Sequence, residues 1–133
     1  MRRKTTLAAH LRKLRRSKYG QELEVAFILH QLLKQTVVSS RLPMAEPLKI
    51  LVAEDELVTR KLIEKFLERE GYRVRSFGNG AEAWSFFQSH PVNVVVSDWM
   101  MPDMDGLDLC RKVRQVKRDD YTYFILLTAV SRS

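Results

Sequence analysis

The apolar residues in the second half of the chain follow two periodicities that alternate along the sequence. Short runs of apolar and β-branched residues, typical of buried strands, are each followed by a segment in which apolar side chains recur every three or four positions, as in amphipathic helices. The pattern predicts strands at residues 48–53, 72–77, 92–97 and 121–128, and helices at residues 57–70, 81–89 and 106–116. This alternation indicates an α/β fold, with a mostly parallel sheet and helices on both of its faces.

The ends of these segments carry turn and cap signals. Gly71 is expected to end the first of these helices, and a Gly-Asn-Gly turn at residues 78–80 to begin the second. Asp105 directly precedes the third helix and is expected to cap it. The apolar positions of the first helix that are expected to face the core are Leu57, Ile63, Phe66 and Leu67.

The first third of the chain has a different character. Residues 1–38 are predicted to form a basic helical extension, either as two short helices or as one broken helix. Residues 39–47 hold two serines and two prolines and are predicted to be a linker, which places the α/β domain at residues 48–133. The alternatives for the extension are a solvated leader, a helix that packs on the domain or dimerises, a contact with nucleic acid or an anionic surface, and a targeting peptide.

Charge supports this division. Residues 1–45 hold ten of the 23 Lys and Arg residues but only two of the 16 Asp and Glu residues, so the net charge of +7 belongs to the extension. A basic extension beside a near-neutral domain leaves nucleic acid as a possible partner, although no helix-turn-helix signature is present. The single cysteine excludes an internal disulfide and, with no apolar run long enough for a membrane span, a cytoplasmic location is expected.

Acidic residues follow two of the predicted strands. Glu54 and Asp55 come directly after the first strand, and Asp98 follows the third. In open parallel sheets the carboxyl ends of the strands meet at one edge, where ligands bind. Carboxylate oxygens suit Mg²⁺ or Mn²⁺, and an aspartate beside such an ion can accept a phosphoryl group as an acyl phosphate. Thr128 ends the fourth strand at the same edge, where its hydroxyl could hydrogen-bond a phosphoryl oxygen.

These residues resemble the receiver domain of bacterial two-component response regulators. The resemblance rests on the acidic pair Glu54-Asp55, on Asp98, on the Met-Pro-Asp-Met-Asp-Gly turn at residues 101–106 and on the Leu-Leu-Thr-Ala sequence at residues 126–129. It implies a flavodoxin-like fold and a phosphorelay role. A sensor histidine kinase or phosphotransfer protein would then donate the phosphoryl group.

The resemblance also implies roles for individual residues. Asp98 would be the phosphoacceptor, and Thr128 the switch hydroxyl. Mg²⁺ would be held by Glu54, Asp55 and Asp98, with the backbone carbonyl of Met100 as a further ligand. The chain would not be an enzyme beyond accepting its own phosphoryl group. A metal-dependent phosphohydrolase is disfavoured because Met100 stands where such enzymes commonly carry a second aspartate.

The sequence departs from the family after the fourth strand. Receiver domains continue through a further helix, a fifth strand that ends in an essential lysine, and a last helix, whereas this chain ends at Ser133. We therefore expect a truncated receiver with four of five strands, whose exposed fourth strand favours self-association. The alternative function is an interaction or oligomerisation module that cannot be phosphorylated and that could contact nucleic acid through the basic extension.

Overall fold

The computed structural model describes residues 20–38 and 46–127. The basic segment 1–19, most of the linker and Thr128 lie outside these ranges. The described elements, in chain order, are α2 (Gly20–Leu32), the π-helix η1 (Leu33–Val38), β1 (Lys49–Ala53), α3 (Leu57–Arg69), β2 (Arg73–Phe77), α4 (Gly80–Ser89), β3 (Val94–Asp98), α5 (Gly106–Gln115) and β4 (Tyr123–Leu127). From β1 onward, each element begins and ends within two residues of its expected position.

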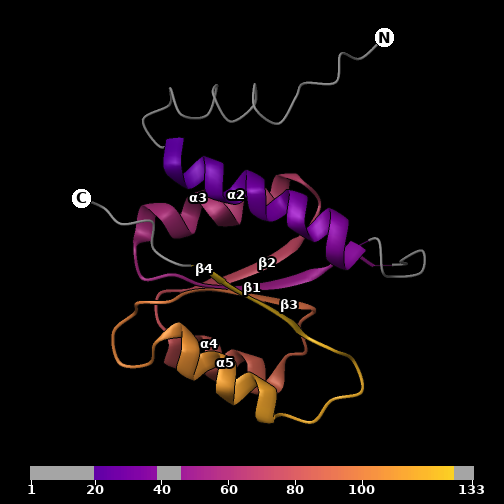
Figure 1. Ribbon diagram of the computed structural model, residues 1–133, viewed down its shortest axis with the longest axis vertical. Helices are drawn as coiled ribbons and strands as arrows, with labels where there is room; N and C mark the ends of the chain where they lie inside the picture. The colour runs from indigo at the N-terminus through magenta and orange to yellow at the C-terminus, as the bar shows by residue number, and fades with distance from the viewer. Residues whose placement is uncertain (1–19, 39–45, 128–133) are drawn as a thin grey trace.

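The four strands form one parallel sheet in the order β2-β1-β3-β4 (Figure 1). Ala53 at the end of β1 is paired with Ser97 of β3, and Asp98 is paired with Leu127 at the end of β4. The carboxyl ends of these three strands therefore lie together at one edge of the sheet. The order and the parallel pairing confirm the expected flavodoxin-like α/β class.

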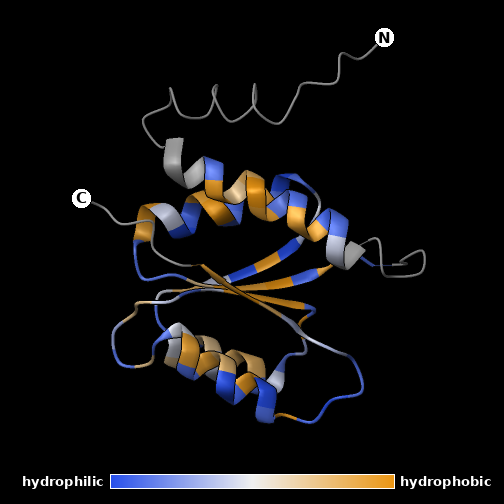
Figure 2. Ribbon diagram, viewed as in Figure 1, coloured by the Kyte–Doolittle hydropathy of each residue, from blue (hydrophilic) through white to orange (hydrophobic). Residues whose placement is uncertain are grey.

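The two strands at the centre of the sheet each hold an unbroken run of buried apolar residues. In β3 the residues Val94, Val95 and Val96 are fully buried, as are Ile50 to Ala53 in β1. Continuous burial, rather than alternation, is what a parallel strand needs when helices cover both of its faces. Figure 2 shows the mostly hydrophobic central strands between two layers of helices that carry both hydrophobic and hydrophilic residues.

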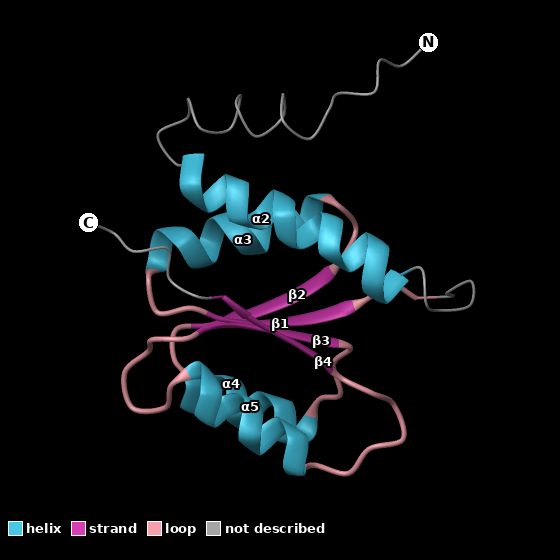
Figure 3. Cartoon of the chain, viewed as in Figure 1, coloured by secondary structure: helices cyan, strands magenta, loops and turns pink. Residues whose placement is uncertain are grey.

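Helices α4 and α5 cover one face of the sheet (Figure 3). Phe87 of α4 and Leu109 of α5 pack there with Leu51 and Val95, whose side chains come from β1 and β3. Each helix begins at a side-chain cap that satisfies a free backbone N–H: Asn79 accepts from Glu82 at 2.8 Å, and Asp105 accepts from Asp108 at 2.8 Å. The expected capping role of Asp105 is confirmed.

Helices α2 and α3 cover the opposite face. Leu29 and Leu33 of the α2–η1 segment are fully buried in the same cluster as Ile63 and Leu67 of α3. The cluster also holds side chains of three strands, namely Ile50, Val52, Val74, Val94 and Val96. The α2–η1 segment, which precedes the linker in the sequence, is thus seated on the sheet and shares its hydrophobic core.

The expectation that Leu57 faces the core is wrong, since 57% of this residue is exposed. Leu57 is the first residue of α3, and the first turn of this helix lies at the rim of the sheet, where the chain has just left β1. Ile63 and Leu67 are fully buried as expected, and Phe66 packs partly against the same cluster.

Strand β4 occupies an edge of the sheet. Within the described residues it pairs with β3 alone, and all five of its residues are half-buried. Across residues 20–38 and 46–127, no helix has the length and apolar character that a membrane span requires.

Candidate functional site

The structure brings Glu54, Asp55 and Asp98 together at the carboxyl edge of the sheet. One carboxylate oxygen from each lies within 4.8 Å of one from each of the others. This follows from topology, because β1 and β3 are neighbouring parallel strands that end at the same edge of the sheet. Glu54 is buried, Asp98 is half-buried and Asp55 is exposed, so the cluster opens to solvent on one side.

Backbone contacts fix the position of Glu54. Its N–H donates to the carbonyl oxygen of Phe77 at 3.0 Å, which extends the pairing of β1 with β2 by one residue. Its carbonyl oxygen accepts from Nη1 of Arg60 at 2.8 Å, and its carboxylate accepts from the Glu56 N–H at 3.3 Å. The Glu54 side chain is thereby held against Asp98 at a depth where only 6% of the residue is exposed.

Glu56 and Arg60 are supporting residues that the sequence analysis did not single out. The carboxylate of Glu56 caps α3 by accepting from the N–H groups of Val58 at 3.2 Å and Thr59 at 2.6 Å. A negative charge at this end of a helix also interacts favourably with the helix dipole. The sequence does carry a signal for the capping role of Glu56, because an acidic residue just before an amphipathic run is a common helix-start pattern.

The pKa of Glu54 is raised from 4.5 to about 8, first by burial and then by the charge of Asp98 and a hydrogen bond with Asp98. The backbone N–H of Glu56 acts in the opposite direction, and the nearby charge of Asp55 adds a small increase. At neutral pH and without a cation, Glu54 therefore holds a proton that it shares with Asp98. A divalent cation at the cluster would replace this proton as the neutralising charge.

This proton makes the stability of the cation-free protein depend on pH. Between the usual pKa of 4.5 and the folded-state pKa of about 8, the folded state binds the Glu54 proton more tightly than the unfolded state does. The unfolding free energy should therefore fall as pH rises through this window, by at most about 1.4 kcal/mol per pH unit, and level off above it.

Denaturant unfolding in EDTA at pH 5 to 9 measures this dependence. Glu54→Gln should remove the fall, whereas Glu68→Gln, at an exposed acid on α3, should retain it. The assignment is wrong if the Glu54→Gln protein shows the same pH dependence as the wild type.

The loop after Asp98 is tightly closed. The N–H of Gly106 donates to the carbonyl oxygen of Trp99 at 2.8 Å, and the N–H of Trp99 donates to that of Leu127 at 3.1 Å. The Ser97 hydroxyl donates to the carbonyl oxygen of Asp98 at 2.8 Å. These bonds hold the loop so that the Asp98 side chain stays beside Glu54.

The remaining candidates lie near this cluster or outside the described residues. Met100 is 68% exposed and Trp99 is 38% exposed on the loop after Asp98. Asp103 is an exposed loop residue with φ of 69°, and it is not part of the carboxylate cluster. Thr128 is outside the described residues, although Leu127 before it is paired with Asp98.

The chemistry available to this arrangement follows from its donor set. The clustered side chains offer only carboxylate oxygens, which are the ligands that Mg²⁺ and Mn²⁺ prefer over softer metals. The proton held by Glu54 indicates that the cluster carries more negative charge than burial tolerates. One half-exposed carboxylate, Asp98, has solvent access beside two further acids that could hold a cation with it, as a nucleophile for an incoming anion requires.

Comparison with known proteins identifies the family of this part of the chain. The family model described as the response regulator receiver domain matches residues 50–133, which include all three clustered carboxylates and the loop that follows Asp98.

Individual relatives agree with this match. The chain is 39% identical over 77 residues to the response regulator receiver protein CpdR of Brucella abortus, covering 58% of this chain and 64% of that protein. It is 38% identical over 87 residues to the response regulator Rre1 of Synechocystis, covering 65% of this chain and 38% of that protein. The chain thus spans between about a third and two thirds of the length of these relatives.

Solved structures show the same fold. The response regulator protein TrrA of Thermotoga maritima, solved in complex with Mg²⁺-BeF, matches with a TM-score of 0.56 and 38% sequence identity. The match covers 62% of this chain and 70% of that one.

Proposed function

We propose that this chain, which belongs to the response regulator receiver domain family, accepts a phosphoryl group on Asp98 in two-component phosphorelay signalling. The donor would be the phosphohistidine of a sensor histidine kinase or of a phosphotransfer protein, in the cytoplasm. The observation that carries the proposal is the cluster of Glu54, Asp55 and Asp98, because it places a carboxylate that solvent reaches among acids that could hold a cation.

In the proposed reaction, a carboxylate oxygen of Asp98 forms a bond to phosphorus while the bond from phosphorus to the donor imidazole breaks. Glu54, Asp55, Asp98 and the backbone carbonyl of Met100 would hold Mg²⁺, which would supply charge neutralisation for the transferred group. Glu54 must release its proton for this binding, because its shared proton and the cation neutralise the same negative charge. The chain accepts one group per cycle and, in this proposal, is a signalling module and not an enzyme that turns over a substrate.

The signal would leave the site through the end of β4. An aspartyl phosphate adds between one and two negative charges and several acceptor oxygens. Thr128, directly after the residue paired with Asp98, is proposed to hydrogen-bond a phosphoryl oxygen and so report the modification.

Asp55→Asn should weaken Mg²⁺ binding at least about tenfold, which corresponds to about 1.4 kcal/mol. The replacement removes a charged ligand and leaves the side chain nearly the same size. The matched control is Asp103→Asn, which changes an exposed acid of the next loop that is outside the cluster and whose left-handed backbone suits asparagine. Isothermal titration with MgCl₂ measures both variants, and equal affinities in the two would disprove the ligand assignment.

The function is tested by the intact mass of the full chain after incubation with acetyl phosphate. The expected result is a gain of one phosphoryl group that requires Mg²⁺ and disappears in EDTA. Asp98→Ala should abolish the gain, and Asp103→Ala should retain it. A folded wild-type chain that gains no mass would contradict the proposal.

The edge strand β4 favours a second candidate function, that of an interaction or oligomerisation module. Its five half-buried residues, Tyr123–Leu127, offer one backbone edge that no described strand pairs with. Such an edge is suited to pairing with a strand of a second copy. Size-exclusion chromatography with light scattering should show a concentration-dependent dimer, and a monomer across the whole concentration range would rule out this mode.

A further inference from the structure

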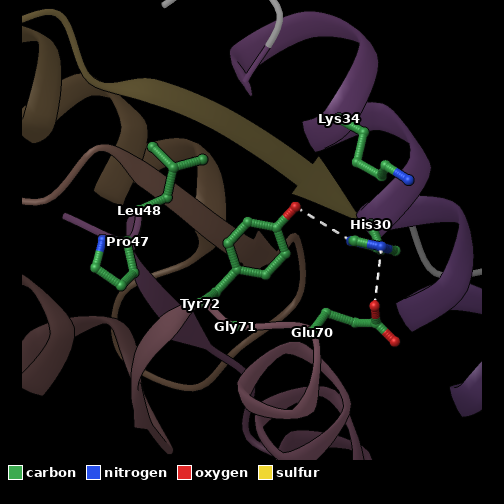
Figure 4. Close-up of a pocket in the computed structure, with 7 residues that line it drawn as sticks. All are labelled: His30, Lys34, Pro47, Leu48, Glu70, Gly71 and Tyr72. Carbon is green, nitrogen blue, oxygen red and sulfur yellow. Dashed lines mark hydrogen bonds and ion pairs between the residues drawn. The ribbon is translucent and has the colours of Figure 1, made fainter. Parts of the chain in front are cut away.

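A second cluster of polar side chains lies at the opposite edge of the sheet, where the strands begin. His30 of α2 contacts Glu70 and Tyr72, which flank Gly71 in the connection from α3 to β2. The three side chains line a cavity of about 390 Å³ whose other walls include Leu48, just before β1 (Figure 4). Because the phosphoacceptor cluster is at the carboxyl ends of the strands, this site is separate from it.

Both ring nitrogens of His30 are engaged. Nδ1 lies 3.1 Å from the Tyr72 hydroxyl oxygen, and Nε2 lies 3.3 Å from a carboxylate oxygen of Glu70 (Figure 4). The ring also makes edge-to-face contacts with Phe66 and Tyr72, and only 8% of the residue is exposed. These contacts bind α2 to the connection between α3 and β2, which lies on the other side of the linker in the sequence.

The neutral imidazole fits this position better than the charged one. In the neutral ring, Nε2–H donates to Glu70 while Nδ1 accepts from the Tyr72 hydroxyl, so every polar atom has a partner. An imidazolium would reverse the second bond, so that Nδ1–H donates to the Tyr72 oxygen and the hydroxyl proton loses its acceptor on His30. Lys34, four residues further along the chain in η1, adds a like charge. The opposing charge of Glu70 is weakened by solvent, since 38% of that side chain is exposed.

The balance of these effects lowers the pKa of His30 below its usual 6.5. Burial is the largest cause, Lys34 acts in the same direction, and Glu70 acts against them. Burial and the charge of Glu70 raise the pKa of Tyr72, so the hydroxyl keeps the proton that it donates to His30.

We propose that the contact of His30 with Glu70 and Tyr72 is a pH-sensitive latch, which seats α2–η1 on the sheet at neutral pH and releases it when the imidazole takes up a proton. Release of the helix would change the exposed surface, because His30 lies between apolar residues of α2–η1 that are buried in the core. Leu29 and Leu33, on either side of His30 in sequence, are fully buried against the sheet. An unseated helix would expose these residues and the face formed by Leu48 and Ile50.

The direction of the pH effect follows from linkage. In the released helix the pKa of His30 has its ordinary value, whereas in the seated helix this pKa is lowered. The free energy that favours the seated helix is therefore fully present above pH 6.5. It falls as the pH drops below that value and levels off below the pKa that His30 has in the seated state.

The experiment follows two readouts in the full chain with saturating Mg²⁺, between pH 5 and 8. The first is the titration of the His30 ring by NMR, with its signal assigned by its absence in His30→Gln; the expected midpoint is shifted below 6.5. The second is hydrogen exchange of amides in residues 24–36, corrected for intrinsic exchange rates; the expected result is a loss of protection at pH 5.5 relative to pH 7.5.

Three variants make the test specific. His30→Gln should abolish the pH-dependent loss of protection, while His90→Gln, at an exposed histidine of the other helical layer, should leave it intact. Tyr72→Phe removes the hydroxyl that donates to Nδ1 and should shift the His30 midpoint upward. A midpoint at or above 6.5, or an undiminished loss of protection in His30→Gln, overturns the latch. If His30→Gln does not fold, a wild-type loss of protection that fails to follow the His30 titration overturns it as well.

Discussion

Gly106→Ala is expected to destabilise the protein by about 3 kcal/mol, the upper end of overpacking costs in a buried site. A Cβ at this position would lie 2.2 Å from the carbonyl oxygen of Asp98 and 2.6 Å from a methyl carbon of Leu126. The first contact is with backbone, so the loop that follows Asp98 must move. Helix propensity works in the opposite direction, because alanine is the better helix former, and so cannot account for a loss.

Denaturant unfolding measures the effect, and Gly78→Ala is the matched control. At Gly78 the nearest atom to a new Cβ is Nη1 of Arg60, at 2.9 Å, which is the end of a flexible side chain. This control should change the unfolding free energy by about 1 kcal/mol or less. Equal losses in the two variants would show that the closure of the loop on Asp98 is not the tight contact described here.

Leu29→Ala is expected to lower the unfolding free energy by about 2–5 kcal/mol. Leu29 is fully buried between α2 and the sheet, in the cluster that holds Ile63 and Val94. The prediction tests whether the helix before the linker belongs to the same cooperative unit as the α/β domain. A segment that is merely tethered would contribute nothing to the unfolding of the sheet.

The control is Leu32→Ala, which makes the same chemical change three residues further along the same helix. Leu32 is 46% exposed, so its replacement should cost no more than about 0.5 kcal/mol. The Mg²⁺ affinity of both variants should match the wild type, because α2 lies away from the carboxylate cluster. If Leu29→Ala costs no more than Leu32→Ala, α2 is not part of the folded core.

The strand ends could be predicted from sequence because each one combines two local signals. A buried parallel strand is an unbroken apolar run, and the polar residues directly after it mark the edge of the sheet. This reasoning placed Glu54 and Asp98 at the same edge before their distance was known. The structure adds that burial, together with the charge of Asp98, raises the pKa of Glu54.

What the sequence could not supply was contact between distant segments. The apolar periodicity of residues 22–38 indicates a helix but does not say which surface its apolar side covers. The contact of His30 with Glu70 and Tyr72 joins residues about 40 positions apart, and no local spacing marks it. Leu57 was misplaced for a related reason, because periodicity alone cannot show that the first turn of α3 lies at the rim of the sheet.

The central claim is that Asp98 itself carries the phosphoryl group, and the most direct test locates the modification in the chain. After incubation with acetyl phosphate and Mg²⁺, borohydride reduces an aspartyl phosphate to homoserine, which leaves a permanent mark that peptide mass spectrometry can assign. The account predicts homoserine at position 98 and at no other acidic residue, with none formed in EDTA. Homoserine at Asp55 or Asp103 instead, or none in a folded chain, would contradict it.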